Sequence, residues 1–351
     1  MSIISSPTQT ESTCKLDWLT LEQWQGFVNT FEESSSFHCQ RWIELIQNQY
    51  GFKLHIPALI KHGEILTAIP FFQTRSLRGQ RKLISLPFTD YLPVLSKSPS
   101  HLNALSQKIQ THFGNQFDSI ILKTDGPIPV AKNQSHQVVH VLRTDRPLED
   151  IEAGFATPIR INLKKAKRRG LDFQIHTDRA AMDIFFQLHT LTRRKLGVPV
   201  QPRSYFDRLQ TEIIETGMGN IGIVTKQNLP IAAGVLLSSN RRLIYKYAAS
   251  DPAALADRPN DWLVYHCIKL AVDSGCKYYD FGISEKSQEG LRRFKKKWGA
   301  EERDIFHNFL AGSPGTNTEP STAVRAAGEV IKRTPTIVCK TLGKVLYKYS
   351  Q

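Results

Sequence analysis

The sequence predicts an α/β protein with mixed sheets, organised as two domains. Its 351 residues exceed what one hydrophobic core usually organises, so two domains of roughly 150 residues each are expected. The predicted elements follow the same order twice, with a helix before a hairpin and a helix before a buried strand. Apolar residues make up 40% of the chain, which is enough to build buried cores. We therefore expect domains at 1–148 and 149–312, followed by a linker and tail at 313–351.

The first domain begins with residues 36–51, which have apolar side chains at helical spacing and end in a glycine, a natural helix stop. Residues 54–72 form two apolar runs around Lys61-His62-Gly63-Glu64, the pattern of two strands joined by a tight turn. A helix at 100–114 and a buried strand at 117–123 complete this half.

The second half repeats the pattern. Residues 182–197 and 204–217 are helical, and residues 221–250 give three strands with turns at Gln227-Asn228 and Ser239-Asn240. A helix (262–275), a strand (276–283), a short helix (291–299) and a last strand (303–311) follow. Residue identity between the halves is poor, so the repeat is one of structure.

The tail at 321–351 is basic and amphipathic, with six Lys and Arg against a single Glu. Such a helix can lie on an anionic membrane surface. Docking on its own protein is an equally good interpretation.

The net charge of +14 and pI near 9.6 favour anionic partners without naming one. The five cysteines are scattered and contain no C-x-x-C pair, which argues against a disulfide framework and a zinc knuckle. We find neither a signal peptide nor an apolar stretch of about 18 residues. These features predict a cytoplasmic protein, with the tail as a candidate contact to the inner face of the membrane.

Two familiar motifs do not fit their surroundings. Residues 217–222 spell G-x-G-x-x-G, but a helix precedes them and a strand follows, the reverse of a dinucleotide-binding turn. Asp280-Phe281-Gly282 imitates a protein-kinase triplet without the accompanying catalytic loop. We interpret the first as a helix cap and the second as a strand end where sites are often built.

The segment from Gly290 to Ala300 holds five cations around two aromatic residues. On a helix, Leu291, Phe294 and Trp298 share one stripe, and Lys295 borders it. We expect the other four cations to be solvated and the Lys295 stem to lie against apolar surface. On spacing alone, a lysine with no functional role is the simpler interpretation.

A family resemblance becomes visible at these residues. Tyr247 to Ser250, then Tyr279-Asp280-Phe281-Gly282-x-Ser284, then Phe294-Lys295-x-x-Trp298-Gly299 resemble the closing half of Fem-type acyltransferases. These GNAT-fold enzymes include peptidoglycan-bridge aminoacyltransferases and relatives linked to surface polysaccharides. Weaker matches occur at Arg160-x-Asn162 and at Leu86 to Tyr91. The resemblance covers about residues 35–310 and implies two tandem GNAT-like domains.

The resemblance implies direct transfer of an acyl or aminoacyl group to an amine of a cell-envelope or polysaccharide precursor. It places Lys295 in the active site, where a fixed cation beside the reacting carbonyl can contribute about 3–4 kcal/mol. Asp280 is the second catalytic candidate, to orient the amine or take its proton, with a structural hydrogen bond as the alternative. The expected substrate-binding residues are Arg160, Asn162, Tyr247, Ser250, Phe281, Gly282, Phe294, Trp298 and Asp90.

The donor stays open between acyl-CoA and aminoacyl-tRNA. Arg258 to Leu263 lack the glycines with which acetyl-CoA enzymes hold a pyrophosphate, and no coiled-coil insertion of the kind found in some tRNA-using relatives is present. We expect no metal, since the 11 histidines are dispersed. The acceptor is expected to be an anionic, nucleotide-linked or lipid-linked sugar or peptide. A basic protein that binds nucleic acid or a membrane surface without catalysis is the alternative of another class.

Overall fold

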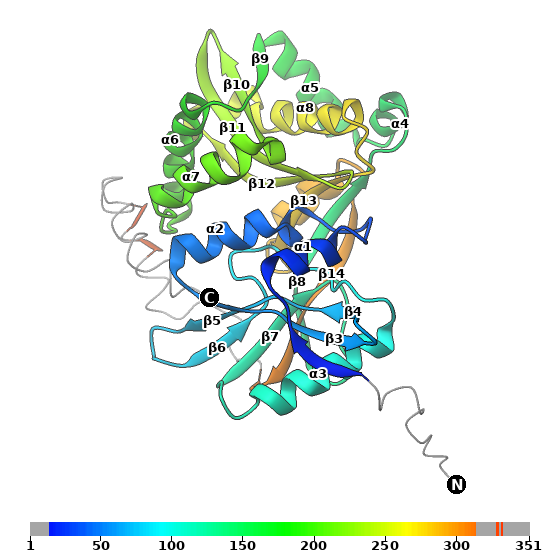
Figure 1. The fold of residues 1–351 in the computed structure, drawn as a ribbon. Coiled ribbons are helices and arrows are strands. Elements are labelled where there is room, and N and C mark those ends of the chain that lie inside the picture. Colours follow the sequence, from blue (N-terminus) through cyan, green and yellow to red (C-terminus); the bar gives the residue numbers. More distant parts are fainter. Residues whose placement is uncertain (1–13, 314–327, 330, 333–351) are drawn as a thin grey trace.

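A computed structural model describes residues 14–313, 328–329 and 331–332 of the protein (Figure 1). The first half contains three α-helices and a short 3₁₀ turn, η2 (Ser36–His38). Its elements are β1 (Lys15–Trp18), α1 (Leu21–Val28), α2 (Gln40–Tyr50), β2 (Lys53–His55), β3 (Pro57–Lys61), β4 (Glu64–Ala68), β5 (Phe71–Arg75), β6 (Arg81–Ile84), α3 (Pro99–Phe113), β7 (Ser119–Thr124) and β8 (Lys132–Arg143).

The second half begins with α4 and α5, which pack in one apolar cluster with α8. Its elements are α4 (Leu148–Ala153), α5 (Thr157–Arg168), β9 (Leu171–His176), α6 (Arg179–Leu196), α7 (Arg203–Leu209), the π-helical η3 (Gln210–Met218), β10 (Gly219–Lys226), β11 (Leu229–Ser239), β12 (Arg242–Ser250), the 3₁₀ turn η4 (Pro252–Asp257), α8 (Pro259–Asp273), β13 (Tyr278–Glu285), α9 (Glu289–Lys296) and β14 (Glu301–Ala311).

One mixed sheet runs through both halves. Its 11 strands lie in the order β2-β5-β6-β7-β14-β8-β13-β12-β11-β10-β9, and β1, β3 and β4 form a separate sheet. β14 comes from the end of the described chain yet pairs with β7 and β8 of the first half. β8 in turn pairs with β13. The two halves are therefore joined by continuous hydrogen bonding along the sheet, which Figure 1 shows as the long strands crossing the middle of the molecule.

The predicted α/β fold with a tandem GNAT-like arrangement is confirmed. In the first half, α3 connects the parallel strands β6 and β7. In the second, α8 connects the parallel strands β12 and β13. Each half thus contains the same strand-helix-strand crossover, as expected from the duplicated order of elements in the sequence.

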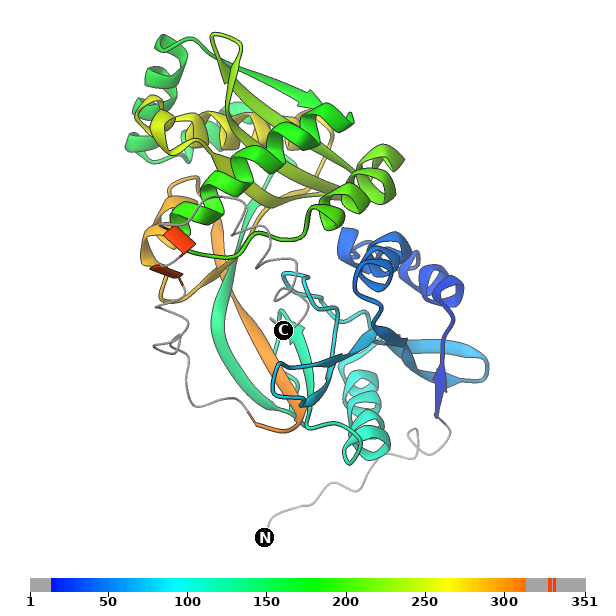
Figure 2. The same ribbon diagram turned by 90° about the vertical axis from the view of Figure 1, so that its left-hand side faces the viewer.

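Helices cover both faces of the second half of the sheet (Figure 2). α6 and α7 pack against Ile221, Ile223 and Val235 on one face, together with α1 and α2 of the first half. α5 and α8 pack against Val224 and Leu236 on the other face. Neighbouring residues of one strand point to opposite faces, which explains why β10 and β11 are apolar almost throughout.

The local signals in the sequence are good guides to element ends. Gly51 ends α2 with a φ of 66°, and the β10–β11 turn occurs at Gln227-Asn228. The following turn has its positive φ values at Asn240 and Arg241, one residue later than predicted. Residues 217–222 cap a helix and enter β10, as expected. The sequence analysis did not predict β8, the longest strand of the first half.

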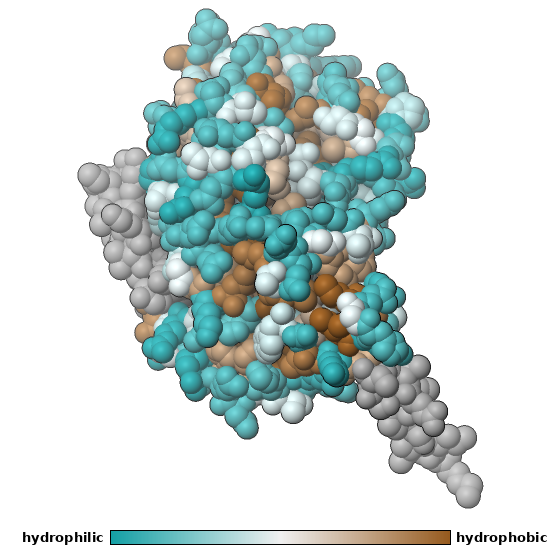
Figure 3. All heavy atoms as spheres, in the orientation of Figure 1, coloured by the Kyte–Doolittle hydropathy of each residue, from teal (hydrophilic) through white to brown (hydrophobic). Residues whose placement is uncertain are grey.

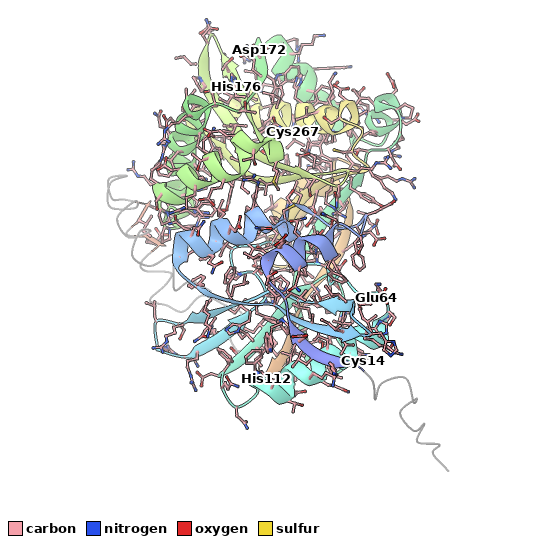
Figure 4. The ribbon with its side chains drawn as sticks, viewed as in Figure 1. Cys14, Glu64, His112, Asp172, His176 and Cys267 are labelled. Atoms are coloured by element: carbon pink, nitrogen blue, oxygen red, sulfur yellow. The ribbon has the colours of Figure 1, made fainter. Side chains whose placement is uncertain are left out.

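The labelled side chains of Figure 4 place Cys14 and Cys267 in different halves. The four cysteines within the described residues are free. Among the same residues, no three His, Cys, Asp or Glu side chains are grouped so that they could hold a metal ion, and no helix is long and apolar enough to span a membrane. Hydrophilic side chains cover most of the upper half of the face shown in Figure 3.

The predicted amphipathic tail lies almost wholly outside the described residues. Of the four that are described, Ile331 is buried in the same apolar cluster as α6. Lys332 forms an ion pair with Glu329 at 2.5 Å. This short stretch contacts the protein, and the membrane interpretation of the tail stays a prediction.

Candidate active site

The site is built where two parallel strands separate. β12 and β13 pair over three positions, from Arg242 opposite Tyr278 to Ile244 opposite Asp280. β12 then continues to Ser250 and β13 to Glu285 without pairing further with each other. The edges of the two strands therefore face an opening beyond Ile244 and Asp280.

A bulge on each strand marks this separation. The β11–β12 pairing skips Lys246, since Val235 lies opposite Tyr247 and Leu236 opposite Tyr245. The β13–β8 pairing is likewise irregular between Asp280 and Ile283. Such bulges bend a strand and redirect its side chains. Gly282 accommodates the second bulge with a φ of 70°, a conformation that glycine adopts without steric cost.

A pocket of about 410 Å³ occupies the opening. β12 contributes Tyr245, Lys246 and Ser250, and β13 contributes Phe281. α8 contributes Asn260 at its first turn, and the remaining wall comes mainly from α9. The wall is largely apolar, with Lys246 and Lys295 as its charged members. We call this space the acyl pocket, after the acyl group that the family resemblance in the sequence leads us to expect.

Lys295 is buried at the pocket wall, with 5% of its surface exposed. Its Nζ donates to the carbonyl oxygens of Gly282 at 2.8 Å and Ile283 at 3.0 Å. Burial lowers the pKa of Lys295 from 10.5 to about 8, although Asp90 and Asp280 act in the opposite direction. An ammonium has three N–H donors, so one remains available beyond these two bonds. The burial agrees with the expected contact of the Lys295 stem with apolar surface, and its catalytic role stays a prediction.

Two of the other cations of α9 form ion pairs that the sequence analysis did not predict. Arg292 forms a two-pronged ion pair with Glu302 of β14, at 2.9 and 2.8 Å. Lys296 lies 3.0 Å from the same carboxylate. The predicted run of purely solvated charge is therefore wrong in part, because two of its members fasten α9 to β14.

Asp280 lies at the last position of β13 that pairs with β12 and is 1% exposed. Its Oδ2 accepts from the Tyr91 hydroxyl at 3.0 Å and from Arg242 at 3.1 Å. Its Oδ1 accepts from the Gly282 amide at 2.8 Å. Desolvation raises the pKa of this carboxyl despite the neighbouring guanidinium. Asp280 does not line the acyl pocket, and its hydrogen bonds hold the strand end and the bulge together.

Asp90 reaches the site from the first half of the chain. Its Oδ1 lies 2.6 Å from Lys246 Nζ, and Lys246 also donates to the Phe88 carbonyl at 3.1 Å. The Lys246 side chain is 4% exposed and lies over the rings of Phe37 and Trp42. This buried ion pair connects the two halves beside the acyl pocket. Sequence reasoning missed Lys246, because its direction depends on the bulge.

The aromatic candidates divide between the wall and its support. Phe281 and Phe294 line the pocket with Ser250. Trp298 is fully buried behind them, with its ring 5.0 Å from that of Phe155. Tyr247 points elsewhere, since its hydroxyl lies 2.9 Å from that of Tyr205.

Arg160 and Asn162 lie on α5, away from the acyl pocket. Arg160 donates to the Ala153 carbonyl at 2.6 Å and lines a separate groove. Asn162 donates to the buried Asp261 carboxylate at 3.3 Å, in the first turn of α8. Asn162 is thus tied to the helix that borders the pocket, and Arg160 to a different surface.

This arrangement has a known counterpart. Residues 154–296 match the family described as the acetyltransferase (GNAT) domain. This segment is similar to a GNAT acetyltransferase domain. It contains β12, α8, β13 and α9, and therefore the acyl pocket and Lys295.

Individual relatives extend the likeness beyond the GNAT domain. The chain is 25% identical over 135 residues to the UDP-N-acetylmuramoylpentapeptide-lysine N(6)-alanyltransferase of Weissella viridescens, a match that spans 38% of this chain and 40% of that protein. The crystal structure of FemX superposes with a TM-score of 0.66 at 16% identity, over 84% of this chain and 96% of that one. The C-terminal domain of a putative lysylphosphatidylglycerol synthetase from Agrobacterium fabrum gives 0.56 at 12% identity, over 92% and 97%. At these identities the structural matches establish the fold.

Proposed function

We propose that this protein is an N-acyltransferase that moves an acyl or aminoacyl group from an activated carrier to an amine of a cell-envelope precursor. The observation that carries the proposal is Lys295, buried in a GNAT domain at the opening between β12 and β13. The sequence match to an enzyme that alanylates a lysine of a muramoyl pentapeptide supports an amine acceptor of this kind.

The reaction proceeds by direct attack. The acceptor amine adds to the ester or thioester carbonyl, whose oxygen becomes an oxyanion, and the carrier then leaves as an alcohol or thiol while the amine loses a proton. The free N–H of Lys295 is suited to stabilise the oxyanion, a contribution of about 3–4 kcal/mol. Phe281 and Phe294 enclose the acyl group on the apolar wall. Asp280 and Asp90 act as positioning residues, through the Gly282 bulge and Lys246.

The first turn of α8 argues against ordinary binding of acetyl-CoA. In this fold, a helix N-terminus with close glycine backbone is what holds a pyrophosphate. Here Asp261 is buried in that turn with 7% exposure, and a carboxylate there opposes a second anion. Every CoA thioester carries this pyrophosphate, so the observation favours an aminoacyl-tRNA as the carrier, with an acyl-CoA whose pyrophosphate is held elsewhere as the alternative.

A catalytically silent nucleic-acid binder is less well supported. Aromatic side chains that stack on bases must be accessible, whereas Trp298 within the basic segment has no exposed surface.

The proposal is tested by incubating the purified protein with UDP-linked muramoyl pentapeptide and one donor at a time: acetyl-CoA, longer acyl-CoAs, or alanyl-tRNA. We expect a mass increase of the acceptor with one donor class. Lys295→Met should reduce turnover by about 10²–10³-fold, while Lys296→Met, a neighbouring exposed lysine, should not. No product with any donor, or equal turnover in the Lys295 variant, contradicts the proposal.

A further inference from the structure

A second concave site lies on the other side of the α8 N-terminus. The groove is formed by α4, α5 and α8 and encloses about 570 Å³. Figure 1 shows these three helices together at the upper end of the molecule. Among the described residues it shares no lining residue with the acyl pocket. Asn260 borders the pocket and Trp262, two residues later, borders the groove, so the two sites lie on different sides of the first turn of α8.

The floor of this α5–α8 groove is aromatic. Trp262 and Tyr265 lie one turn apart on α8, with ring centroids 6.0 Å apart and an interplanar angle of 33°. Phe155 and Leu163 extend the apolar surface. The Trp262 Nε1 atom is buried and has no hydrogen-bond partner within the described part of the chain. A broad ring surface of this kind is suited to stack on a planar heterocycle.

The rim of the groove is basic. Arg160, Lys164 and Lys167 follow one another at i, i+4 and i+7 on α5, which places them on one helical face. Within residues 14–313, neither Lys164 nor Lys167 forms an ion pair. The opposing carboxylates are Glu149 and Glu152, and Glu152 accepts from the Tyr265 hydroxyl at 2.7 Å. Three cations against two carboxylates leave the rim with an excess positive charge.

We propose that the α5–α8 groove binds the nucleoside-phosphate part of a substrate, with the base on Trp262 and the phosphate at Lys164 and Lys167. An apolar chain alone would use the aromatic floor and leave the cations unpaired. A free phosphate would use the cations without the floor. A nucleoside phosphate matches both.

The position of the groove connects it with the acyl pocket. A substrate with a nucleoside phosphate at one end and a reacting group at the other can pass over the first turn of α8 and occupy both sites. This reading of the substrate rests on the proposed transferase function, whereas nucleotide binding in the groove does not depend on catalysis. Binding of an adenosine phosphate would indicate that the groove holds part of the donor, and binding of a uridine phosphate that it holds part of the acceptor.

The test is calorimetric titration of the full chain with adenosine 3′,5′-bisphosphate, with UDP, and with inorganic phosphate. We expect one nucleotide to bind more tightly than phosphate, and the preferred base to identify which substrate uses the groove. Trp262→Ala and the double variant Lys164→Ala/Lys167→Ala should each weaken binding about tenfold or more. Arg168→Ala, an exposed cation of the same helix outside the groove, should bind like the natural protein.

Lys295→Met separates this inference from the proposed function, because it should reduce turnover by about 10²–10³-fold and leave nucleotide affinity unchanged. The lysine variants change exposed positions, so they remain informative if Trp262→Ala fails to fold. The inference is overturned if neither nucleotide binds better than phosphate, or if the groove variants bind as tightly as Arg168→Ala.

Discussion

The burial of Lys295 predicts a specific dependence of stability on pH. In the folded protein its pKa is lowered from 10.5 to about 8 because the ammonium is removed from water. Between these two values the unfolded chain holds a proton that the folded protein has released. Folding stability should therefore rise with pH across this window, and below about pH 8 the cost of burying the charge is present in full.

The size of the effect follows from the same two values. One pKa unit corresponds to about 1.4 kcal/mol, so the drop from 10.5 to about 8 corresponds to about 3 kcal/mol. Integration over the experimental range leaves about 2.5 kcal/mol between pH 7 and pH 10. Lys295→Met removes the titrating group. The difference between the free energies of unfolding of the natural protein and the variant should therefore change by this amount from pH 7 to pH 10, in favour of the natural protein.

The assay is urea unfolding of both proteins at half-unit intervals from pH 7 to pH 10, with Lys296→Met as the matched control. Taking the difference between proteins is necessary because Lys123 also has a pKa lowered to about 8 by desolvation. A difference that stays constant with pH would falsify the reasoning, since the Lys295 ammonium would then be as well solvated in the folded state as in the unfolded chain. If the charged form stabilises the oxyanion, turnover should also decline as the pH rises through about 8.

Asp280→Asn and Gly282→Ala, with Gly275→Ala as the control, distinguish residues that hold the site in shape from residues that take part in the reaction. Asp280→Asn removes the carboxylate partner of Arg242 and should lower the free energy of unfolding by about 3 kcal/mol in urea at pH 7; a stable variant with turnover reduced far more than tenfold would instead indicate a direct catalytic role. Gly282→Ala and Gly275→Ala both force alanine into a positive φ, at 70° and 66°, which costs about 1–2 kcal/mol. The added Cβ at Gly282 would lie 3.0 Å from Asp90 Oδ2, while that at Gly275 has no heavy atom within 4 Å, so we expect Gly282→Ala to lose more stability and also turnover. If both variants lost the same stability in thermal unfolding and Gly282→Ala kept its turnover, the conformation of the bulge would not affect the position of Asp90.

Local patterns in the sequence were sufficient to predict most elements of the second half. The spacing of Leu291, Phe294 and Trp298 predicted one apolar stripe, but the stripe is buried only in part: Leu291 is 40% exposed, and the fully buried Trp298 lies just beyond the end of α9. The same reasoning succeeded at the β3–β4 and β10–β11 hairpins, where both strands and the turn are close in sequence. In each case the information lies within one or two turns of the chain.

β8 illustrates the other kind of element. Its partners are β13 and β14, which are far along the chain, and only four of its 12 residues are apolar. Pairing with distant strands stabilises β8, and no local periodicity in its sequence predicts that pairing. The predicted domain boundaries at 148 and 312 remain predictions, and the sheet shows that β14 crosses into the first half.

The sequence by itself determined the fold class and the repeated order of elements, because these depend on helical and strand periodicity, while the family resemblance singled out Lys295. The tertiary structure decided that Asp90 meets Lys246, that Asp280 is committed to Tyr91 and Arg242, and that Arg160 belongs to a groove separate from the acyl pocket. Those contacts join residues that are distant in the chain or depend on strand bulges. Their energies arise from burial and charge pairing, which exist only when the two halves have assembled into one sheet.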